Sequence, residues 1–137
     1  MPMDDRKSYV IDDLISMLGE KAVLGEISDT KGYLSDWHGR FHGAAHAVVL
    51  PESTAQVSAI MAYADEHNII VVPQGGNTGF MGGATPDESG NTILLSLRRM
   101  NKVRDFDTKN MSMTVEAGCI LQNLQEIAED SGAVLSA

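Results

Sequence analysis

The sequence predicts an α+β fold, in which a small parallel sheet is flanked by helices and a second sheet begins. Two short apolar runs, residues 47–50 and 69–72, enclose a helical pattern, and a strand, helix and strand this close together favour a right-handed parallel crossover. A third apolar run at 92–97 adds a strand to this sheet. Residues 103–107 and 111–116 follow as two strands around a turn, and the second alternates apolar and polar residues as half-exposed strands do.

The first predicted element is a helix at residues 8–18, preceded by a flexible segment at 1–7. Its apolar residues recur at helical spacing, and Gly19 is a stop signal. The segment 19–46 has scattered glycines and no periodicity, so we expect it to be irregular. The apolar residues of the helix are Val10, Ile11, Leu14, Ile15 and Leu18.

Two later helices have recognisable ends. The first starts after Ser53, which has Gln56 three residues later, the spacing of a capping box, and it is expected to end near His67. The second follows Gly118 and is closed by a glycine at its carboxyl end. Residues 133–135 then resemble the start of another strand, which suggests that the chain is truncated there.

The composition excludes several classes of protein. The length of 137 residues fits one domain, and 43% hydrophobic with 21% charged residues is typical of globular proteins. A formal net charge of −9 argues against a nucleic-acid partner, which needs clustered Lys and Arg. No apolar run approaches the about 20 residues of a membrane helix, and the N-terminus lacks the apolar core of a signal peptide. We therefore expect a cytoplasmic protein without a transmembrane segment.

The most informative stretch is the loop at 73–83, which follows the second apolar run. Five glycines fall within residues 75–83, and no acidic or basic side chain lies between His67 and Asp87. A strand that leads into an uncharged, glycine-rich loop exposes successive backbone N–H groups, which bind phosphate or diphosphate. The alternative is that the glycines only serve tight turns, although each glycine costs about 0.5–1 kcal/mol of backbone entropy relative to Ala.

Two common phosphate motifs do not fit this loop. A P-loop requires a Lys, and none occurs between Lys31 and Lys102. A Rossmann turn requires two glycines spaced i, i+2, and the loop has no such pair. The remaining hypothesis is a loop whose backbone wraps a diphosphate without a cation.

The chain resembles the FAD-linked oxidases with a vanillyl-alcohol-oxidase-type flavin domain, also called PCMH-type. The glycine loop is similar to their pyrophosphate loop, and four further motifs follow the family in order. The resemblance covers about residues 8–137 and is greatest to the branch that oxidises D-2-hydroxy acids, the D-lactate, glycolate and D-2-hydroxyglutarate dehydrogenases. The further motifs are Tyr33-Leu34-Ser35-Asp36-Trp37, Leu50-Pro51-Glu52-Ser53, Met100-Asn101-Lys102-Val103 and Val115-Glu116-Ala117-Gly118-Cys119.

The resemblance implies FAD as cofactor and assigns roles to the loop. Residues 75–79 would offer backbone N–H groups to the FAD diphosphate, with side-chain hydrogen bonds from Asn77 and Thr78. Two later glycines would let the backbone pass close to the cofactor, and Ser96 would lie near it. The implied cofactor-binding residues are Pro73, Gln74, Gly75, Gly76, Asn77, Thr78, Gly79, Gly82, Gly83 and Ser96.

Two residues depart from the family pattern. Gln74 stands where many relatives carry Arg, so one positive charge near the diphosphate is missing. Thr78 stands where covalently flavinylated relatives place a His, so we expect FAD to be bound non-covalently. The resemblance extends only to the first half of the flavin domain, and it implies that the catalytic base and the metal-binding histidines belong to a substrate domain in the family's remainder. We therefore predict no catalytic residue and no metal ligand in this chain.

A few other side chains could carry chemistry. His38, His42 and His46 would share one face of a helix and could bind zinc, but glycines interrupt the segment, so we expect surface or loop histidines. Cys119 could be a reactive thiol near the start of a helix, although a small buried residue at a tight turn is favoured. Trp37 is expected to pack against the core.

Two functions are compatible with the sequence. In the first, the chain is the FAD diphosphate-binding N-terminal part of a flavin-dependent oxidoreductase that oxidises a small D-2-hydroxy acid. In the second, it is a truncated remnant without flavin or activity, which acts at most as a binding or assembly module. Because a two-sheet domain cut between its sheets exposes apolar surface, we expect the isolated chain to form a homo-oligomer.

Overall fold

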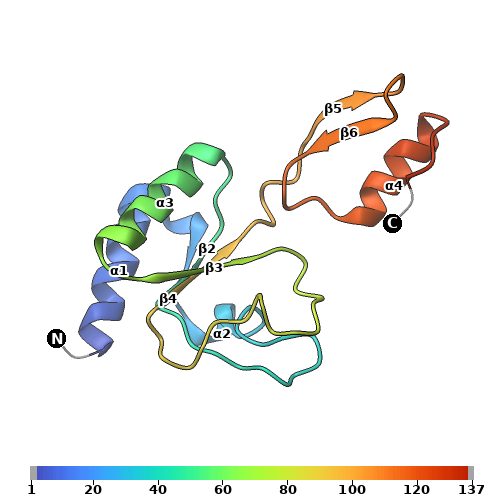
Figure 1. Ribbon diagram of the computed structural model, residues 1–137. Helices are drawn as coiled ribbons and strands as arrows, with labels where there is room; N and C mark the ends of the chain where they lie inside the picture. Colours follow the sequence, from blue (N-terminus) through green and yellow to red (C-terminus); the bar gives the residue numbers. More distant parts are fainter. Residues whose placement is uncertain (1–2, 136–137) are drawn as a thin grey trace.

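The computed structural model describes residues 3–135 and consists of two lobes joined by the segment that follows the fourth strand (Figure 1). The first lobe contains α1 (Met3–Leu18), the short 3-10 helix η1 (Glu20–Ala22), β1 (Val23–Leu24), α2 (Ile27–Thr30), β2 (Ala47–Val49), α3 (Thr54–Glu66), β3 (Ile70–Gln74) and β4 (Thr92–Ser96). The second lobe contains β5 (Val103–Asp107), β6 (Ser112–Val115) and α4 (Leu121–Asp130).

The sheet of the first lobe has the order β1-β2-β4-β3. The strands β2, β4 and β3 run parallel, and β1 adds an antiparallel edge. The predicted parallel sheet is thus confirmed. Although β4 is the last of these four strands in the sequence, it lies between β2 and β3 in the sheet. The carboxyl ends of the parallel strands β3 and β4 are therefore neighbours.

The strands β2 and β4 are buried on both faces, and each face has a different cover. Ala47 and Val49 belong to the main core together with residues of α1 and α3, whereas Val48 belongs to a smaller cluster with Tyr33 and Leu34. Both long helices therefore lie on one face of the sheet, and Figure 1 shows them side by side there. The predicted helices thus flank the sheet on that face, and the segment that contains Tyr33 and Leu34 covers the other.

The capping signal before α3 is confirmed. The Ser53 hydroxyl accepts a hydrogen bond from the Gln56 N–H at 3.2 Å, and the Gln56 side chain accepts one from the Glu52 N–H at 2.8 Å. Together these contacts satisfy backbone donors at the helix start. The helix ends with His67 as its C-cap, as the sequence predicts.

The second lobe is an antiparallel pair followed by a helix. The strands β5 and β6 pair with an irregularity between Val103 and Asp105, and α4 follows the Ala117–Cys119 turn. The two strands and the helix confirm the predicted order of elements. Between residues 103 and 135, however, Ala128 is the only buried residue.

Three predictions about segments differ from the structure. Residues 3–7 belong to α1 instead of forming a flexible end, and residues 1–2 lie outside the described part. The segment 19–46 contains three short elements that are too brief to produce a periodic pattern. Residues 133–135 form no strand. Within residues 3–135, no helix combines the length and apolar character needed to cross a membrane.

Candidate functional site

The glycine loop begins where β3 and β4 end together. Gln74 and Ser96 form the last pair of the parallel ladder, and the Leu97 N–H continues it by donating to the Gln74 carbonyl at 2.9 Å. Both members of the pair are buried, and the loop leaves the sheet immediately after Gln74. The site is therefore built where the edge strand β3 ends beside its inner neighbour β4.

The Gln74 side chain holds the loop in place through two hydrogen bonds. Its amide nitrogen donates to the Tyr33 carbonyl at 2.9 Å and to the Ala84 carbonyl at 3.0 Å, so it connects the beginning and end of the loop to a neighbouring segment. With both amide hydrogens engaged, this side chain supports the loop structure. Ser96 lies buried beside it, at the base of the loop.

Asn77 anchors the middle of the loop. It adopts a left-handed conformation with φ of 56°, which Asn tolerates better than most residues. Its side-chain amide donates to the Ser35 carbonyl at 2.8 Å. In this structure its amide donor thus faces a protein carbonyl, and the Thr78 side chain is exposed.

The glycines fall into two groups when a Cβ atom is added to each. At Gly82, with φ of 73°, the added atom would lie 2.9 Å from the Phe41 ring, so turn geometry and packing explain this glycine. At Gly75, Gly79 and Gly83 the added atom would meet nothing within 4 Å, and at Gly76 the nearest atom, the Thr78 methyl, is 4.0 Å away. These four also have no positive φ. Tight turns therefore account for one loop glycine out of five.

The backbone donors of the loop are unused. Among the described residues, no N–H group from Gly75 to Gly83 donates a hydrogen bond to a protein acceptor. Unpaired N–H groups beside glycines that lack side chains leave room for an acceptor to come close to the backbone. The loop thus fits an anion such as a diphosphate.

A cleft of about 800 Å³ lies next to the loop, between the two lobes. Gly75 and Gly76 contribute one part of its lining, and the Ala117–Cys119 turn contributes another. The apolar side of α4 completes it with Leu121, Leu124 and Ile127. The cleft is large enough for a dinucleotide cofactor.

Arg98 also lines this cleft, a residue that the sequence analysis did not select. The loop was predicted to bind its ligand without a cation, and the structure adds an arginine to the lining of the same cleft. The signal was present in the sequence, because Arg98 follows Ser96 by two residues at the end of β4. Finding it required knowing that β4 neighbours β3.

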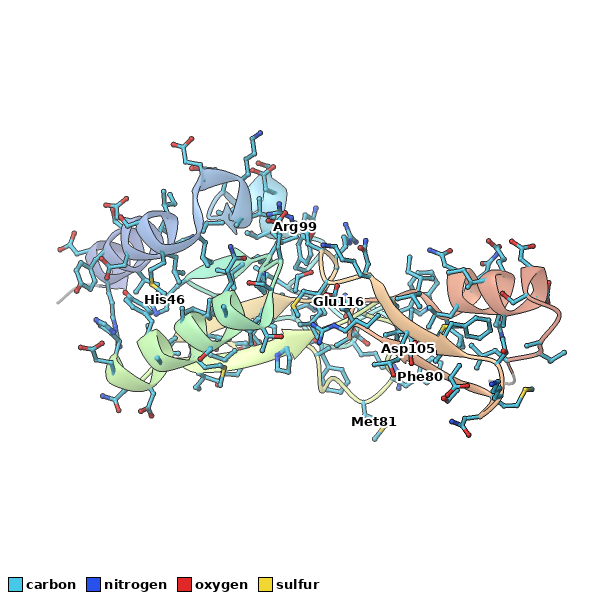
Figure 2. The ribbon with its side chains drawn as sticks, turned by 90° about the horizontal axis from the view of Figure 1, so that it is seen from above. His46, Phe80, Met81, Arg99, Asp105 and Glu116 are labelled. Carbon is cyan, nitrogen blue, oxygen red and sulfur yellow. The ribbon has the colours of Figure 1, made fainter. Side chains whose placement is uncertain are left out.

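The tip of the glycine loop carries exposed apolar side chains. Phe80 and Met81 are 60% and 88% exposed, and Figure 2 shows Met81 pointing away from the chain. His38 contacts the Phe80 ring with centroids 4.8 Å apart. The expectation for Trp37 is wrong, because its side chain is 72% exposed on the neighbouring loop.

The three clustered histidines do not meet. His42 bonds the Gly39 carbonyl at 2.9 Å, while His46 lies in the bend just before β2, where its ring is buried and a ring nitrogen is 3.3 Å from the Asn91 side-chain oxygen. Within residues 3–135 no group of three possible ligands could hold a metal.

Cys119 is half-buried at the cleft wall, with its thiol 3.7 Å from the Lys102 carbonyl.

Comparison with known proteins agrees with this geometry. The sequence family described as "FAD binding domain" matches residues 45–137. Among curated proteins, the probable mitochondrial D-2-hydroxyglutarate dehydrogenase of Oryza sativa subsp. indica is 39% identical over 88% of this chain. The D-2-hydroxyglutarate dehydrogenase of Stutzerimonas stutzeri is 31% identical over 90% of it. The chain spans 21% and 26% of the length of these two relatives.

Solved structures show the same fold. The 4-ethylphenol oxidase from Gulosibacter chungangensis superposes with a TM-score of 0.77 at 30% identity, over 94% of this chain and 25% of its own. p-Cresol methylhydroxylase gives a TM-score of 0.77 at 22% identity, over 95% of this chain and 25% of its own. The arrangement of elements is therefore that of PCMH-type FAD-binding domains.

Proposed function

Because the chain belongs to the FAD binding domain family, we propose that its glycine loop holds the diphosphate of a non-covalently bound FAD. The enzyme would be an oxidoreductase that acts on a small D-2-hydroxy acid. The family and the fold indicate FAD as the cofactor of this domain. The role of the individual loop residues is our proposal.

One observation carries the assignment of the loop. Four of its glycines face open space with ordinary backbone angles, and the N–H groups of the same stretch have no protein acceptor among the described residues. Packing inside the chain gives no reason for these glycines. Close approach of a phosphate-bearing ligand to the backbone does give one.

The loop is also held in a defined shape. Gln74 fixes its two ends by hydrogen bonds to the Tyr33 and Ala84 carbonyls, and Asn77 fixes its middle to the segment that contains Ser35. A loop that is already ordered loses less entropy when the ligand binds. These residues would therefore orient the cofactor without contacting its reactive ring.

The substrate class comes from the relatives. FAD, when bound, supplies the acceptor for the hydride removed from the hydroxyl-bearing carbon. The relatives from Oryza sativa and Stutzerimonas stutzeri are named D-2-hydroxyglutarate dehydrogenases, and a D-2-hydroxy acid is accordingly the class we propose. This chain would contribute cofactor binding, with the catalytic groups on the rest of the enzyme.

The location stays a prediction. The composition favours the cytoplasm, whereas the Oryza sativa relative carries the word mitochondrial in its name.

The test is to change Gly76 to Val. A Cβ atom added there meets no protein atom closer than the Thr78 methyl at 4.0 Å, so we expect the fold to tolerate the change, while the space for a diphosphate would be filled. We expect FAD affinity, measured by the change of flavin fluorescence on titration, to fall at least about tenfold, which corresponds to about 1.4 kcal/mol.

The matched control is Gly32→Val. Gly32 also has open space around its Cβ position and no positive φ, but it lies outside the loop and outside the cleft lining. Its FAD affinity should equal that of the unmodified chain, and circular dichroism should show both variants folded. Equal affinity of Gly76→Val and Gly32→Val would refute the assignment of the loop.

A further inference from the structure

We propose that Arg98 binds the diphosphate together with the glycine loop and contributes the positive charge that the loop itself lacks. This inference rests on the proposed function and deepens it, because it adds a residue from a second strand to the same site. The ligand chemistry is a diphosphate ester, and the donor is a guanidinium at the edge of the cleft.

The position of Arg98 follows from the register of the sheet. Gln74 pairs with Ser96, so Gly76 and Arg98 each lie two residues beyond the last pair of two neighbouring parallel strands. Both residues line the cleft. Ligands of parallel sheets bind at the carboxyl ends of the strands, which is where these two residues are placed.

Arg98 is available for a ligand. Its neighbour Arg99 is paired with Glu52, whereas Arg98 is exposed and has no carboxylate within 4.0 Å among the described residues. Its guanidinium carbon lies 5.6 Å from the centroid of the Tyr33 ring. Tyr33 in turn is tied to the loop, because its carbonyl accepts a hydrogen bond from Gln74.

This arrangement suits phosphate recognition. The face of a guanidinium can rest on an aromatic ring while its N–H groups, which lie in its plane, remain free to donate. The planar set of donors matches two phosphate oxygens at once. The contact with the Tyr33 ring can thus position the Arg98 side chain without using its donors.

The charge of the cleft lining is unusual for this chain. The protein has 19 acidic and 10 basic residues, yet Arg98 is the only charged residue among the described residues that line the cleft. A carboxylate there would repel a diphosphate at short range, and none is present in the lining. The local charge is therefore opposite to the net charge of −9.

The start of α4 adds to this positive environment. Ile120 is the N-cap of α4 and makes no side-chain capping hydrogen bond, and both Ile120 and Leu121 line the cleft. The N-terminal end of a helix carries a partial positive charge. Its contribution is secondary, because the sequence places apolar side chains there.

The test compares FAD binding by the full chain with that of Arg98→Ala and Arg98→Lys. Flavin fluorescence titrations are run at about 0.01 M and about 1 M ionic strength, where the Debye length is about 30 Å and about 3 Å. We expect Arg98→Ala to bind FAD about tenfold more weakly at low salt, the effect of one charge-assisted hydrogen bond. The loss should shrink at high salt, and Arg98→Lys should retain part of the affinity.

The control is Arg104→Ala, which removes an exposed arginine of β5 that pairs with Glu116 and does not line the cleft. Its FAD affinity should not change. The inference is overturned if Arg98→Ala binds as tightly as the unmodified chain, or if its loss is the same at both salt concentrations, which would indicate a structural role. If the unmodified chain does not bind FAD at all, both the proposed function and this inference fail. If the unmodified chain binds FAD and Arg98→Ala binds it as tightly, only this inference fails.

Discussion

The two lobes of the molecule differ in how they bury apolar surface. In the first lobe, residues from both long helices and the sheet form one core, in which Leu14, Ile60 and Ile93 are fully buried. In the second lobe, Ala128 is the only buried residue between positions 103 and 135. Large apolar side chains remain exposed there, among them Met111, Ile120, Leu121, Ile127 and Val134.

The two walls of the cleft belong to different lobes, so they differ in how firmly they are packed. The glycine loop follows β3 and is fixed by hydrogen bonds from the Gln74 and Asn77 side chains, so its shape is set before a ligand binds. The α4 wall belongs to a lobe with little core of its own, and local opening is easier where few apolar contacts are buried. We therefore expect a rigid diphosphate side and an adaptable apolar side of the cleft. The expected homo-oligomer, which would cover exposed apolar surface, stays a prediction.

The largest difference between the lobes should appear when core side chains are shortened. Ile60→Ala removes a fully buried side chain from α3, and we expect a loss of about 2–5 kcal/mol in the free energy of unfolding. Ile127→Ala removes a side chain of α4 that is 38% exposed, and the loss should stay below about 1 kcal/mol. Urea denaturation followed by circular dichroism measures both. Equal losses would contradict the contrast between the lobes.

A smaller effect is expected from pH, and it belongs to the first lobe alone. Burial lowers the pKa of the His46 imidazole below its ordinary value of 6.5, the hydrogen bond to Asn91 opposes this, and the charges of Arg6 and Lys7 lower it further. Well above pH 6.5 the imidazole is neutral in both the folded and the unfolded chain, so its burial costs no stability through protonation. As the pH falls below 6.5, the unfolded chain binds a proton that the folded chain excludes, so stability decreases.

The measurement is the free energy of unfolding between about pH 7 and about pH 5, before most carboxylates titrate. In His46→Gln the decrease should be smaller, while in the exposed His38→Gln it should match the unmodified chain. All four histidines precede residue 68, so amide exchange in the second lobe should not follow this titration. An unchanged pH dependence in His46→Gln would show that the buried imidazole is not its source.

Much of the fold could be predicted because its signals are local. The apolar spacing of α1, the pair Ser53 and Gln56, and the alternation in β6 each determine an element within a few residues. The elements η1, β1 and α2 were missed because two to four residues carry no period. The position of β4 between β2 and β3 depends on contacts far apart in the sequence, which no local pattern contains.

The same distinction applies to the site. The glycines at 75–83 mark the loop in the sequence, since a nest needs successive N–H groups without side chains. The sequence does not reveal that Gln74 supports the loop through Tyr33 and Ala84, because these partners are 41 and 10 residues away. Arg98 was missed for the same reason, as its place in the same cleft lining as Gly76 follows from the pairing of β3 with β4.

The most direct test of the account is amide hydrogen exchange of the loop with and without FAD, read residue by residue by NMR. The N–H groups of residues 75–79 have no acceptor among residues 3–135, so they should exchange rapidly in the free chain and become protected when FAD is added. Amides of the β5–β6 turn serve as an internal reference and should not change. Protection of residues 75–79 on addition of FAD is the predicted result, and exchange that stays equally rapid with saturating FAD would contradict the claim that this loop holds the diphosphate.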